Sequence, residues 1–407
     1  MKRRRVPARR AAKERVEIQP LSTSPRIYLD NAATSWPKPQ AVYMAVEHAM
    51  RHVGAPAGRS PYAEAIEATR SVEAARRACA GLLGVVDPAR LIFTTSGTHA
   101  LNLAIHGLLQ PGDHVVTSVV EHNSVLRPLA AWRDRGAISL TYLSCDGMGR
   151  IDPDDVRDAI EPNTRLVVLT HASNVTGAIQ PVAEVAAIAR ERGVRMLVDA
   201  AQTAGHLPID VETLGVDLLA TSGHKGLLGP LGTGLLYLGA EMGGALLPLE
   251  QGGTGTHSEE DQQPTTLPDR FESGNLNVPA IVGLGAGTDF LVARGVVARH
   301  AESQALVERL RGGLAEVPGV RLFGPPAADS VALVSVTIEG YDPQEAAAVL
   351  DASFRIQVRP GLHCAPLMHR ALGTIAQGGT VRLSLGAFTT AEEIDAVLTA
   401  IRQMTAH

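Results

Sequence analysis

The sequence predicts an α/β fold built on a mainly parallel central sheet. Apolar runs rich in Val, Leu and Ile recur along the chain, and each run ends in small polar residues. Segments with a helical spacing of apolar residues, such as residues 182–193, lie between these runs. Strands that alternate with helices are typical of parallel sheets. The expected strands are residues 90–97, 113–124, 137–146, 164–177, 194–206 and 216–225.

Further elements are predicted by apolar spacing and by terminal residues. Residues 64–84 place an Ala- and Leu-rich stripe on one helical face, and residues 98–109 repeat that spacing. Gly193 is expected to follow the end of helix 182–193. Residues 27–34 predict a short strand that runs into a polar turn. The C-terminal expectations are helix and turn 300–323, strand 330–340, helix 343–351, strand 380–388 and helix 391–404.

Four parts of the chain are expected, and 407 residues are enough for two or three domains. They are a basic, disordered tail (1–20), an N-terminal segment associated with the small domain (21–50), a large domain (51–290) and a small α+β domain (291–407). The most apolar stretch, residues 226–249, contains Pro230 and Pro248. It therefore predicts a strand and loops rather than a membrane span.

Charge and cysteine content predict an ordinary reducing, cytoplasmic location. The formal net charge is -5, which gives no global attraction to nucleic acid or to a membrane. The first fifteen residues hold eight Lys or Arg and one Glu, typical of a solvated tail or of an arm that binds nucleic acid or a membrane surface. No apolar segment follows, so we do not expect a secretory signal. Three cysteines make no disulfide framework, and no metal site is predicted.

Polar residues follow five of the predicted strands, at the point where each strand ends. They are residues 95–98, 121–123, 171–174, 199–202 and 222–225. Ligands bind beyond the carboxyl ends of parallel strands, so we expect these segments to meet in one site.

Two charged residues in these segments indicate the chemistry. Lys225 follows a buried strand in a Gly-rich turn, where desolvation lowers the pKa of an amine and makes it nucleophilic. Asp199 ends another apolar strand and needs a cationic partner. A protonated pyridine ring is such a partner, and that ring then accepts electrons from a carbanion. Gln202 can donate to a ring oxygen, and His122 can stack on the ring.

A phosphate group also has an expected binding place. Gly97 and Thr98 lie at a helix N-terminus, where free N–H groups and the helix dipole favour an anion. Ser222 and His224 can add hydrogen bonds. An amine nucleophile, a pyridine partner, a stacking ring and a phosphate site together predict pyridoxal 5′-phosphate (PLP) as the cofactor.

A cysteine loop, residues 359–369 (RPGLHCAPLMH), carries the third reactive group. Pro360, Gly361 and Pro366 are expected to exclude a regular helix or a central strand. A thiol that works as a nucleophile must ionise, and neighbouring cations such as His363 or Arg359 favour the thiolate. We therefore expect Cys364 to be reactive and mobile rather than structural.

Eight motifs carry a family resemblance over residues 27 to about 388. They are YLDNAAT, FTTSGTHALNLA, EHNSVLRP, HASNVTGAIQP, VDAAQTAGH, TSGHKGLLGPLGTG, RFESGNLN and RPGLHCAP. The chain resembles the cysteine desulfurase and selenocysteine lyase family of class V aminotransferase-like enzymes, which have the type I fold of PLP-dependent transferases. The cysteine motif is similar to that of the second, SufS-like group.

The resemblance implies a role for each matching residue. Lys225 matches the lysine that carries PLP, and Cys364 matches the nucleophile that accepts sulfur. The implied cofactor contacts are Lys225, Asp199, Gln202, His122, Gly97, Thr98, Asn174, Ser222, His224 and Asn275. The implied substrate contacts are Arg382, which grips the carboxylate, with Asn174, Arg359, Asn31 and Ala32. His122 is also expected to take part in catalysis, and a homodimer is expected.

Three positions depart from the family pattern. Asn275 stands where relatives often have a Thr that reaches the phosphate in the neighbouring subunit. Leu362 replaces the first of two histidines before the cysteine, and residues 54–62 lack a histidine that many relatives carry.

The expected reaction converts L-cysteine to L-alanine and leaves a persulfide on Cys364, from which a protein acceptor takes the sulfur. L-selenocysteine is an alternative substrate with the same chemistry. Another class V elimination or epimerisation would not need Cys364. A Cys-His hydrolase is a further alternative, but it would give Lys225 and Asp199 no role. A PLP-binding scaffold that binds nucleic acid would leave Lys225, Asp199 and Cys364 unexplained.

Overall fold

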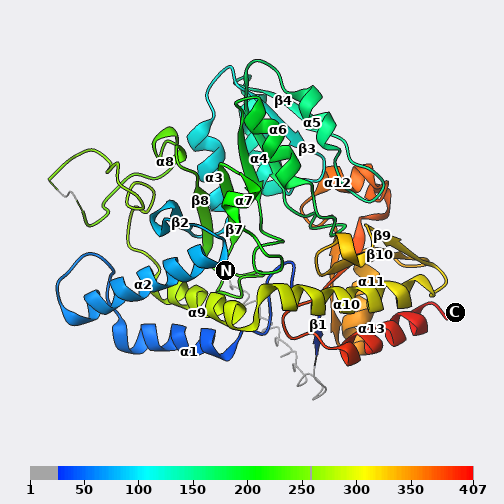
Figure 1. Ribbon diagram of the computed structural model, residues 1–407. Helices are drawn as coiled ribbons and strands as arrows, with labels where there is room; N and C mark the ends of the chain where they lie inside the picture. The colour runs from blue at the N-terminus through cyan, green and yellow to red at the C-terminus, as the bar shows by residue number, and fades with distance from the viewer. Residues whose placement is uncertain (1–25, 257–258, 407) are drawn as a thin grey trace, which may run out of the picture.

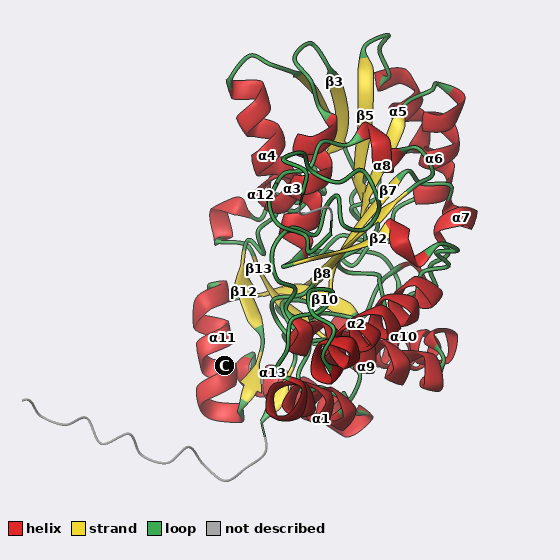
Figure 2. Cartoon of the chain, turned by 90° about the vertical axis from the view of Figure 1, so that its left-hand side faces the viewer, coloured by secondary structure: helices red, strands yellow, loops and turns green. Residues whose placement is uncertain are grey.

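The structure is a computed structural model of the protein, and it describes residues 26–256 and 259–406. A seven-stranded sheet lies at the centre of the larger part (Figures 1 and 2). Its order is β2-β8-β7-β6-β5-β3-β4. The strands are β2 (Leu91–Thr94), β3 (His114–Ser118), β4 (Ser139–Leu143), β5 (Thr164–Thr170), β6 (Arg195–Asp199), β7 (Leu218–Ser222) and β8 (Gly234–Leu238).

The predicted mainly parallel sheet is confirmed. Strands β4, β3, β5, β6 and β7 pair in parallel, whereas β8 runs antiparallel to both β7 and β2. The central strands are buried along nearly their whole length, and alternate residues of β5 enter different cores. Leu166 and Val168 belong to one core, and Val167 and Leu169 to the other. Apolar residues therefore occupy both faces of the sheet, as in parallel sheets covered by helices.

The helices of this part connect the strands. They are α3 (Gly97–Leu108), α4 (Asn123–Asp134), α5 (Pro153–Ala159), α6 (Val182–Glu191), α7 (Val211–Leu214) and α8 (Met242–Ala245). Several begin with a capping residue soon after a strand end, and the side chain of that residue accepts a hydrogen bond from a free amide of the first helical turn. Ser96 caps α3 by accepting from His99 N–H, and His122 caps α4 by accepting from Ser124 N–H.

A second sheet, of four antiparallel strands, lies in the C-terminal part (Figure 1). Its order is β12-β13-β10-β9, formed by β9 (Val320–Phe323), β10 (Leu333–Ile338), β12 (Arg359–Gly361) and β13 (Thr380–Ser384). The helices here are α10 (Val296–Ala315), α11 (Pro343–Phe354), α12 (Pro366–Ala371) and α13 (Ala391–Met404). Strand β1 (Ile27–Tyr28) pairs with β11 (Ile356–Gln357), so the N-terminal segment lies against this part.

Three further helices complete the structure: α1 (Gln40–His48), α2 (Ala63–Leu82) and α9 (Val278–Arg294). The sequence did not predict α9, because three glycines interrupt its apolar pattern. These glycines are required for packing: a Cβ on Gly285 would lie 2.8 Å from the Cβ of Ala75 in α2, and one on Gly287 would lie 2.6 Å from Leu227 O. Shorter helical turns span Ala49–Val53, Pro88–Arg90, Ala327–Asp329 and Ile375–Gln377.

Two local expectations are wrong. The expected helix and turn 300–323 ends in strand β9 rather than in a turn. The cysteine loop was expected to hold no regular helix, yet α12 begins at Pro366. Proline is compatible with the first helical position because its missing N–H would have no partner there.

No single helix within the described residues is long and apolar enough to cross a membrane. The pair α9 and α10 together has the length and composition of a membrane span, but it is bent by 81°. The basic tail, residues 1–20, lies outside the described residues.

Candidate active site

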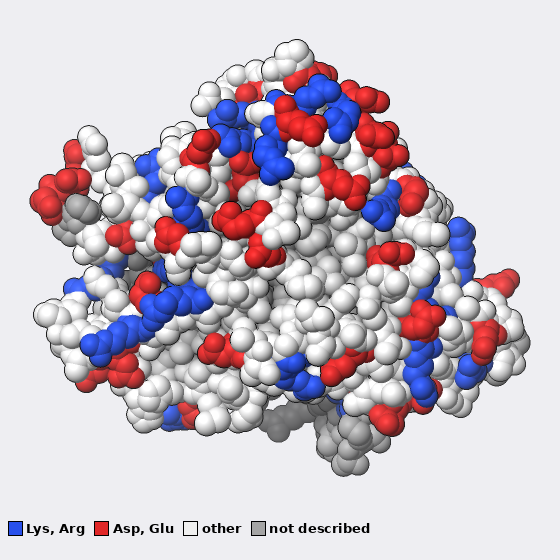
Figure 3. All heavy atoms as spheres, viewed as in Figure 1, with Lys and Arg blue, Asp and Glu red and all other residues white. Residues whose placement is uncertain are grey.

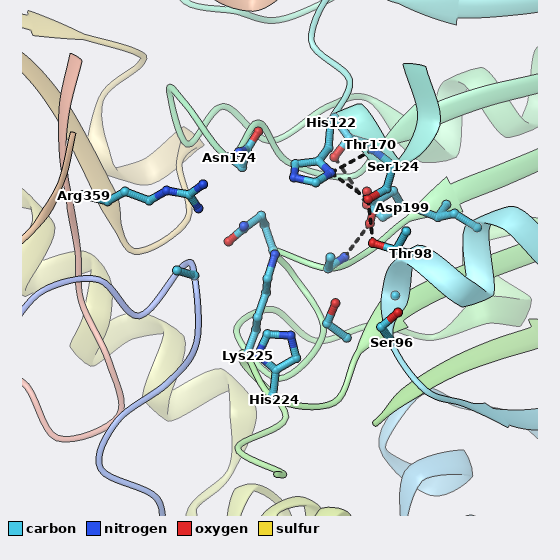
Figure 4. Close-up of a pocket in the computed structure, with 16 residues that line it drawn as sticks. Ser96, Thr98, His122, Ser124, Thr170, Asn174, Asp199, His224, Lys225 and Arg359 are labelled. Atoms are coloured by element: carbon cyan, nitrogen blue, oxygen red, sulfur yellow. Dashed lines mark hydrogen bonds between the residues drawn. The ribbon is translucent and has the colours of Figure 1, made fainter. Parts of the chain in front are cut away.

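The segments after the strands meet in one pocket, of about 220 Å³, beyond the carboxyl edge of the seven-stranded sheet (Figure 4). Ten predicted site residues line it: Gly97, Thr98, His122, Asn174, Asp199, Gln202, Ser222, His224, Lys225 and Arg359. Six further residues line the pocket and were not predicted individually, although Ser96 and Ala201 lie in the predicted segments: Ala33, Ser96, Leu101, Ser124, Thr170 and Ala201. Ser96 and Ser124 had a signal in the sequence, because both lie in polar segments at helix starts.

Lys225 extends into the middle of the pocket from the turn after β7 (Figure 4). Burial lowers the pKa of its amine to about 8, and the nearby guanidinium groups of Arg382 and Arg359 act in the same direction. The negative charge of Asp199 opposes this shift. Roughly a tenth of the amine is therefore neutral and nucleophilic at pH 7, far more than for an ordinary lysine, whose pKa is about 10.4.

Asp199 ends β6 and lines the same pocket. Its Oδ1 accepts a hydrogen bond from Ala201 N–H at 2.9 Å, and its Oδ2 has no hydrogen-bond partner among the described residues. Burial raises the pKa of this carboxyl, and the Lys225 amine pulls it back. A cationic N–H donor placed in the pocket would satisfy Oδ2 and keep the carboxylate charged.

His122 lies at the other side of the pocket and is held by its own helix. Ser124 N–H donates to Nδ1 of His122 at 3.0 Å, and Ser124 Oγ lies 2.9 Å from the same nitrogen. Nδ1 is thus the acceptor, and the proton of the neutral ring lies on Nε2. Burial, followed by the charge of Lys225, lowers the pKa of His122 to about 3. The ring is therefore neutral, which suits it to stack on a flat ligand.

An anion-binding place is formed by the start of α3 and the end of β7. Thr98 Oγ1 lies 2.8 Å from Ser124 Oγ, which connects it to the His122 network. A Cβ on Gly97 would lie 2.5 Å from Ser222 Oγ, so a larger residue here would displace the Ser222 hydroxyl group from the anion-binding place. Nδ1 of His224 is buried and has no partner among the described residues. Free amides of α3, hydroxyl groups and an unpartnered imidazole nitrogen are the donors that a phosphate needs.

Arg382, on β13, is fully buried and is already paired. Its Nη2 lies 3.0 Å from Oδ1 of Asp30, and its Nη1 donates to Asn174 O at 3.0 Å. Its Nε is buried without a partner among the described residues. Burial lowers the pKa of Arg382 to about 10, yet the group stays charged at neutral pH. Asp30 was not predicted as a site residue, although the YLDNAAT motif contains it.

Arg359 connects the cysteine loop to the pocket. Its guanidinium lines the pocket, and its Nη2 lies 3.4 Å from Sγ of Cys364. Figure 4 shows Arg359 entering from the side opposite Ser96 and Thr98. A thiolate on Cys364 would thus face a permanent cation.

His363 is not the second cation that the sequence suggested. Its Nε2 bonds Thr380 Oγ1 at 3.0 Å, its ring packs against His369, and burial lowers its pKa to about 2. The imidazole is therefore neutral.

Five predicted site residues do not line the pocket: Arg382, Cys364, Ala32, Asn31 and Asn275. Ala32 O accepts from Nε2 of Gln202 at 3.1 Å, so Ala32 positions Gln202. The Asn31 amide donates to Tyr28 O and Ser384 O and accepts from Trp36 N–H. Asn31 thus ties the N-terminal segment to β13. Asn275 is exposed in the loop before α9.

The site residues fit PLP in three respects. Asp199 has a free oxygen for a protonated pyridine nitrogen, His122 presents a neutral ring, and the start of α3 offers donors for a phosphate. Lys225 lies between these groups as an amine of lowered pKa. No group of three or more His, Cys, Asp or Glu side chains that could hold a metal is found in the described part of the chain.

Comparison with known proteins agrees with this fit. The aminotransferase class-V family profile matches residues 27–397. A probable cysteine desulfurase of Methanothermobacter thermautotrophicus is 36% identical over 372 residues, which cover 90% of this chain and 92% of the relative. A probable cysteine desulfurase of Halalkalibacterium halodurans is 36% identical, with 93% of each chain covered.

Solved structures give the same result. The apo cysteine desulfurase of Thermococcus onnurineus NA1 has a TM-score of 0.88 at 32% identity and covers 94% of this chain and 95% of its own. The cysteine desulfurase CsdA of Escherichia coli has a TM-score of 0.83 at 31% identity, covering 93% and 94%. The chain therefore belongs to the class V aminotransferase family and has its PLP-dependent transferase fold of type I. Within that family it lies among the cysteine desulfurases.

Proposed function

We propose that this chain is a PLP-dependent cysteine desulfurase that converts L-cysteine to L-alanine and collects the sulfur on Cys364. The contact between Arg359 and Cys364 carries the proposal. One guanidinium group lines the pocket of Lys225 and Asp199 and also touches Sγ at 3.4 Å. A PLP enzyme without sulfur transfer would not need a thiol at this position.

Four residues act in the first half of the reaction, in which the substrate is bound and loses its α-proton. PLP bound in this pocket supplies an electron sink that weakens the C–H bond at the substrate α-carbon. Lys225 holds the cofactor and, once free, takes the α-proton on Nζ. Asp199 keeps a protonated ring nitrogen in place. Arg382 and Asn174 orient the substrate carboxylate, to which a guanidinium fork is complementary.

Cys364 performs the sulfur transfer. Its thiolate forms an S–S bond to the substrate sulfur while the Cβ–S bond of the substrate breaks. The electron pair of the broken bond stays on Cβ, which takes up a proton and becomes the methyl group of alanine. The two sulfur atoms remain together as a persulfide on Cys364, and Arg359 stabilises the negative charge on either sulfur.

Cysteine and selenocysteine share this chemistry, and the pocket residues give no reason to reject either. We therefore propose L-cysteine as the substrate on the basis of the relatives, and L-selenocysteine as the alternative. The ratio of kcat/KM for the two amino acids separates the two functions.

We further propose that the active unit is a cytoplasmic homodimer that passes sulfur to a protein acceptor. An apolar groove of about 820 Å³ runs along α1 and is lined by Tyr43, Met50 and Leu231. These side chains are 45%, 67% and 66% exposed. A second copy that covers this groove would account for their exposure. Light scattering checks the mass, and Met50→Glu should produce monomers.

Nucleic acid is not proposed as a partner. On the face shown in Figure 3, basic and acidic side chains are interspersed.

The absorption spectrum tests the cofactor and the substrate together. Purified protein loaded with PLP should show the band of lysine-bound PLP, and Lys225→Ala should lose it. L-cysteine should change this band and release alanine. A band that L-cysteine does not change would contradict the proposed substrate, and no band after reconstitution would contradict the proposed cofactor.

A further inference from the structure

The backbone of the cysteine loop is unusual at the thiol itself. His363 has φ 49° and Cys364 has φ 60°, both in the left-handed region. Among the described residues only Leu228 and Arg355 share this property without being glycine. The left-handed region is unfavourable for a residue with a side chain, and two in succession need external support.

Two hydrogen bonds supply that support from different elements. Asn123 N–H donates to Cys364 O at 2.7 Å, and Nδ2 of Asn174 donates to His363 O at 2.6 Å. Both carbonyl groups of the left-handed pair are thus fixed to the pocket wall. Asn174 follows β5 and Asn123 begins α4.

The Asn123 bond lies directly beside the cofactor site. Asn123 is the first residue of α4, and its amide is one of the four that a helix leaves free. The amide of Ser124, one residue further, is used by His122. At the start of α4, the amide of Asn123 therefore holds Cys364, and the next amide, that of Ser124, holds the ring of His122.

We propose that the bond from Asn123 N–H to Cys364 O is a latch that positions the Cys364 thiol toward the cofactor site. This role as a positioning group for sulfur transfer rests on the proposed function. With the latch closed, Sγ lies 3.4 Å from Nη2 of Arg359, a residue that lines the pocket. When the latch opens, the Cys364 peptide leaves its left-handed conformation and the thiol turns outward to deliver sulfur.

The movement is confined to a few residues. The neighbours on both sides of the thiol are buried, His363 to 98% and Ala365 fully. Ala365 N–H also donates to Leu362 O at 2.9 Å, which closes a tight turn. A rotation of the Cys364 peptide is therefore the opening motion, not a displacement of the entire loop.

Asn123→Pro removes the latch and also pushes it open, since the proline Cδ would lie against Cys364 O, which is 2.7 Å from the amide nitrogen. Proline lacks the N–H and is favoured at the first helical position. It requires an extended residue before it, and His122 already has φ -75° and ψ 154°. Asn123→Ala is the matched control, because it removes the side chain and retains the N–H.

The readout is the rate at which iodoacetamide alkylates Cys364 in the PLP-loaded enzyme, followed by mass spectrometry. Asn123→Pro should raise this rate by at least about fivefold, because loss of one ordinary hydrogen bond alone produces an equilibrium change of that size. Asn123→Ala should react like the wild type. Cys145, which is half-buried, serves as an internal reference whose rate should not change. A Cys364 rate that is equal in both variants and the wild type would overturn the latch.

Hydrogen exchange of the wild-type enzyme gives a second test, should Asn123→Pro fold poorly. The Asn123 amide should be protected in the resting enzyme and lose protection once Cys364 is alkylated. Rapid exchange of this amide in the resting enzyme would contradict the proposal. Neither readout requires turnover. If both readouts support the latch but the enzyme produces no alanine from L-cysteine, only the proposed function is disproved.

Discussion

The carboxylate of Asp30 lies 3.0 Å from Nη2 of Arg382, across 352 positions of sequence. Arg382 is fully buried, whereas the Asp30 side chain is 24% exposed. The arginine expected to bind the substrate carboxylate is thus held by an acid from the N-terminal segment. Asp30 fixes the direction of the guanidinium and offsets the cost of burying its charge.

Asp30→Ala should therefore weaken both folding and substrate binding. Loss of the partner of a buried donor costs about 1–3 kcal/mol of unfolding free energy. A misdirected Arg382 should raise KM for L-cysteine about tenfold, which corresponds to about 1.4 kcal/mol of binding. Chemical denaturation and steady-state kinetics measure the two effects. Asp30→Asn keeps an oxygen acceptor and should fall between wild type and Asp30→Ala, whereas an unchanged KM in both variants would contradict this role.

The lowered pKa of Lys225, about 8, predicts how PLP loading depends on pH. Only the neutral amine reacts with PLP. The rate of PLP uptake by the apoprotein should therefore rise with pH, with a midpoint near the pKa of Lys225. Asp199 raises the pKa of Lys225, so Asp199→Asn should move the midpoint to lower pH. Asp134→Asn, a change on an exposed carboxylate, should leave it in place. A midpoint that moves to higher pH in Asp199→Asn would disagree with the site electrostatics.

Glu121 should be a neutral acid at moderate pH. Its Oε1 accepts from Ser118 Oγ at 2.6 Å and from Thr170 N–H at 3.0 Å, and its Oε2 is buried without a partner among the described residues. Burial is the main cause that raises its pKa to about 8. The folded state therefore binds a proton that the unfolded state releases between pH of about 4 and 8, and stability falls as pH rises through this range.

Glu121→Gln should remove this pH dependence. Relative to wild type, the variant should gain unfolding free energy as pH rises from about 4 to 8, because the amide cannot ionise. Glu121→Ala should remove the same pH dependence but be about 1–3 kcal/mol less stable than Glu121→Gln at every pH, since it leaves two buried donors without an acceptor. A constant difference between wild type and Glu121→Gln across this range would show that Glu121 is already ionised in the fold.

Lys38 should support the turn that carries Lys225. The carbonyl oxygen of His224 accepts from Lys38 Nζ at 2.8 Å, from Ser35 N–H at 3.0 Å and from Thr34 Oγ1 at 3.2 Å. Burial lowers the pKa of Lys38 to about 8, which means that its charge is not favoured by the fold. Lys38→Met should therefore lower kcat about fivefold, as expected for one lost hydrogen bond, without lowering Tm. Lys38→Arg is the control that keeps a donor, and a large fall in Tm with normal kcat in Lys38→Met would contradict the assignment.

The sequence was sufficient to predict the sheet and the place of the site, because both follow from local rules. Each strand appears as an apolar run, and parallel strands bring their carboxyl ends to one edge. Lys225, Asp199 and His122 could thus be expected to meet without knowledge of strand order. Residue types and positions indicated the chemistry of Lys225, Asp199 and His122, whereas the substrate contacts came from the family resemblance, and the PLP contacts remain predictions.

The parts that were missed depend on contacts between distant segments. Helix α9 was hidden by glycines whose purpose is close packing on α2 and on the turn near Leu227. The pairing of Asp30 with Arg382 joins the two ends of the chain and has no local signal. His363 was expected to be a cation, but only its burial and its bond to Thr380 reveal that it is neutral.

The most direct test of the account is alanine production from L-cysteine by the PLP-loaded enzyme and by its Cys364→Ala variant, with a reductant present. The wild type should produce one alanine for each sulfide released. Cys364→Ala should keep the PLP band, still respond to L-cysteine, and produce alanine only at background level. A variant that continues to produce alanine at a rate near wild type would contradict the assignment of Cys364 as the sulfur acceptor.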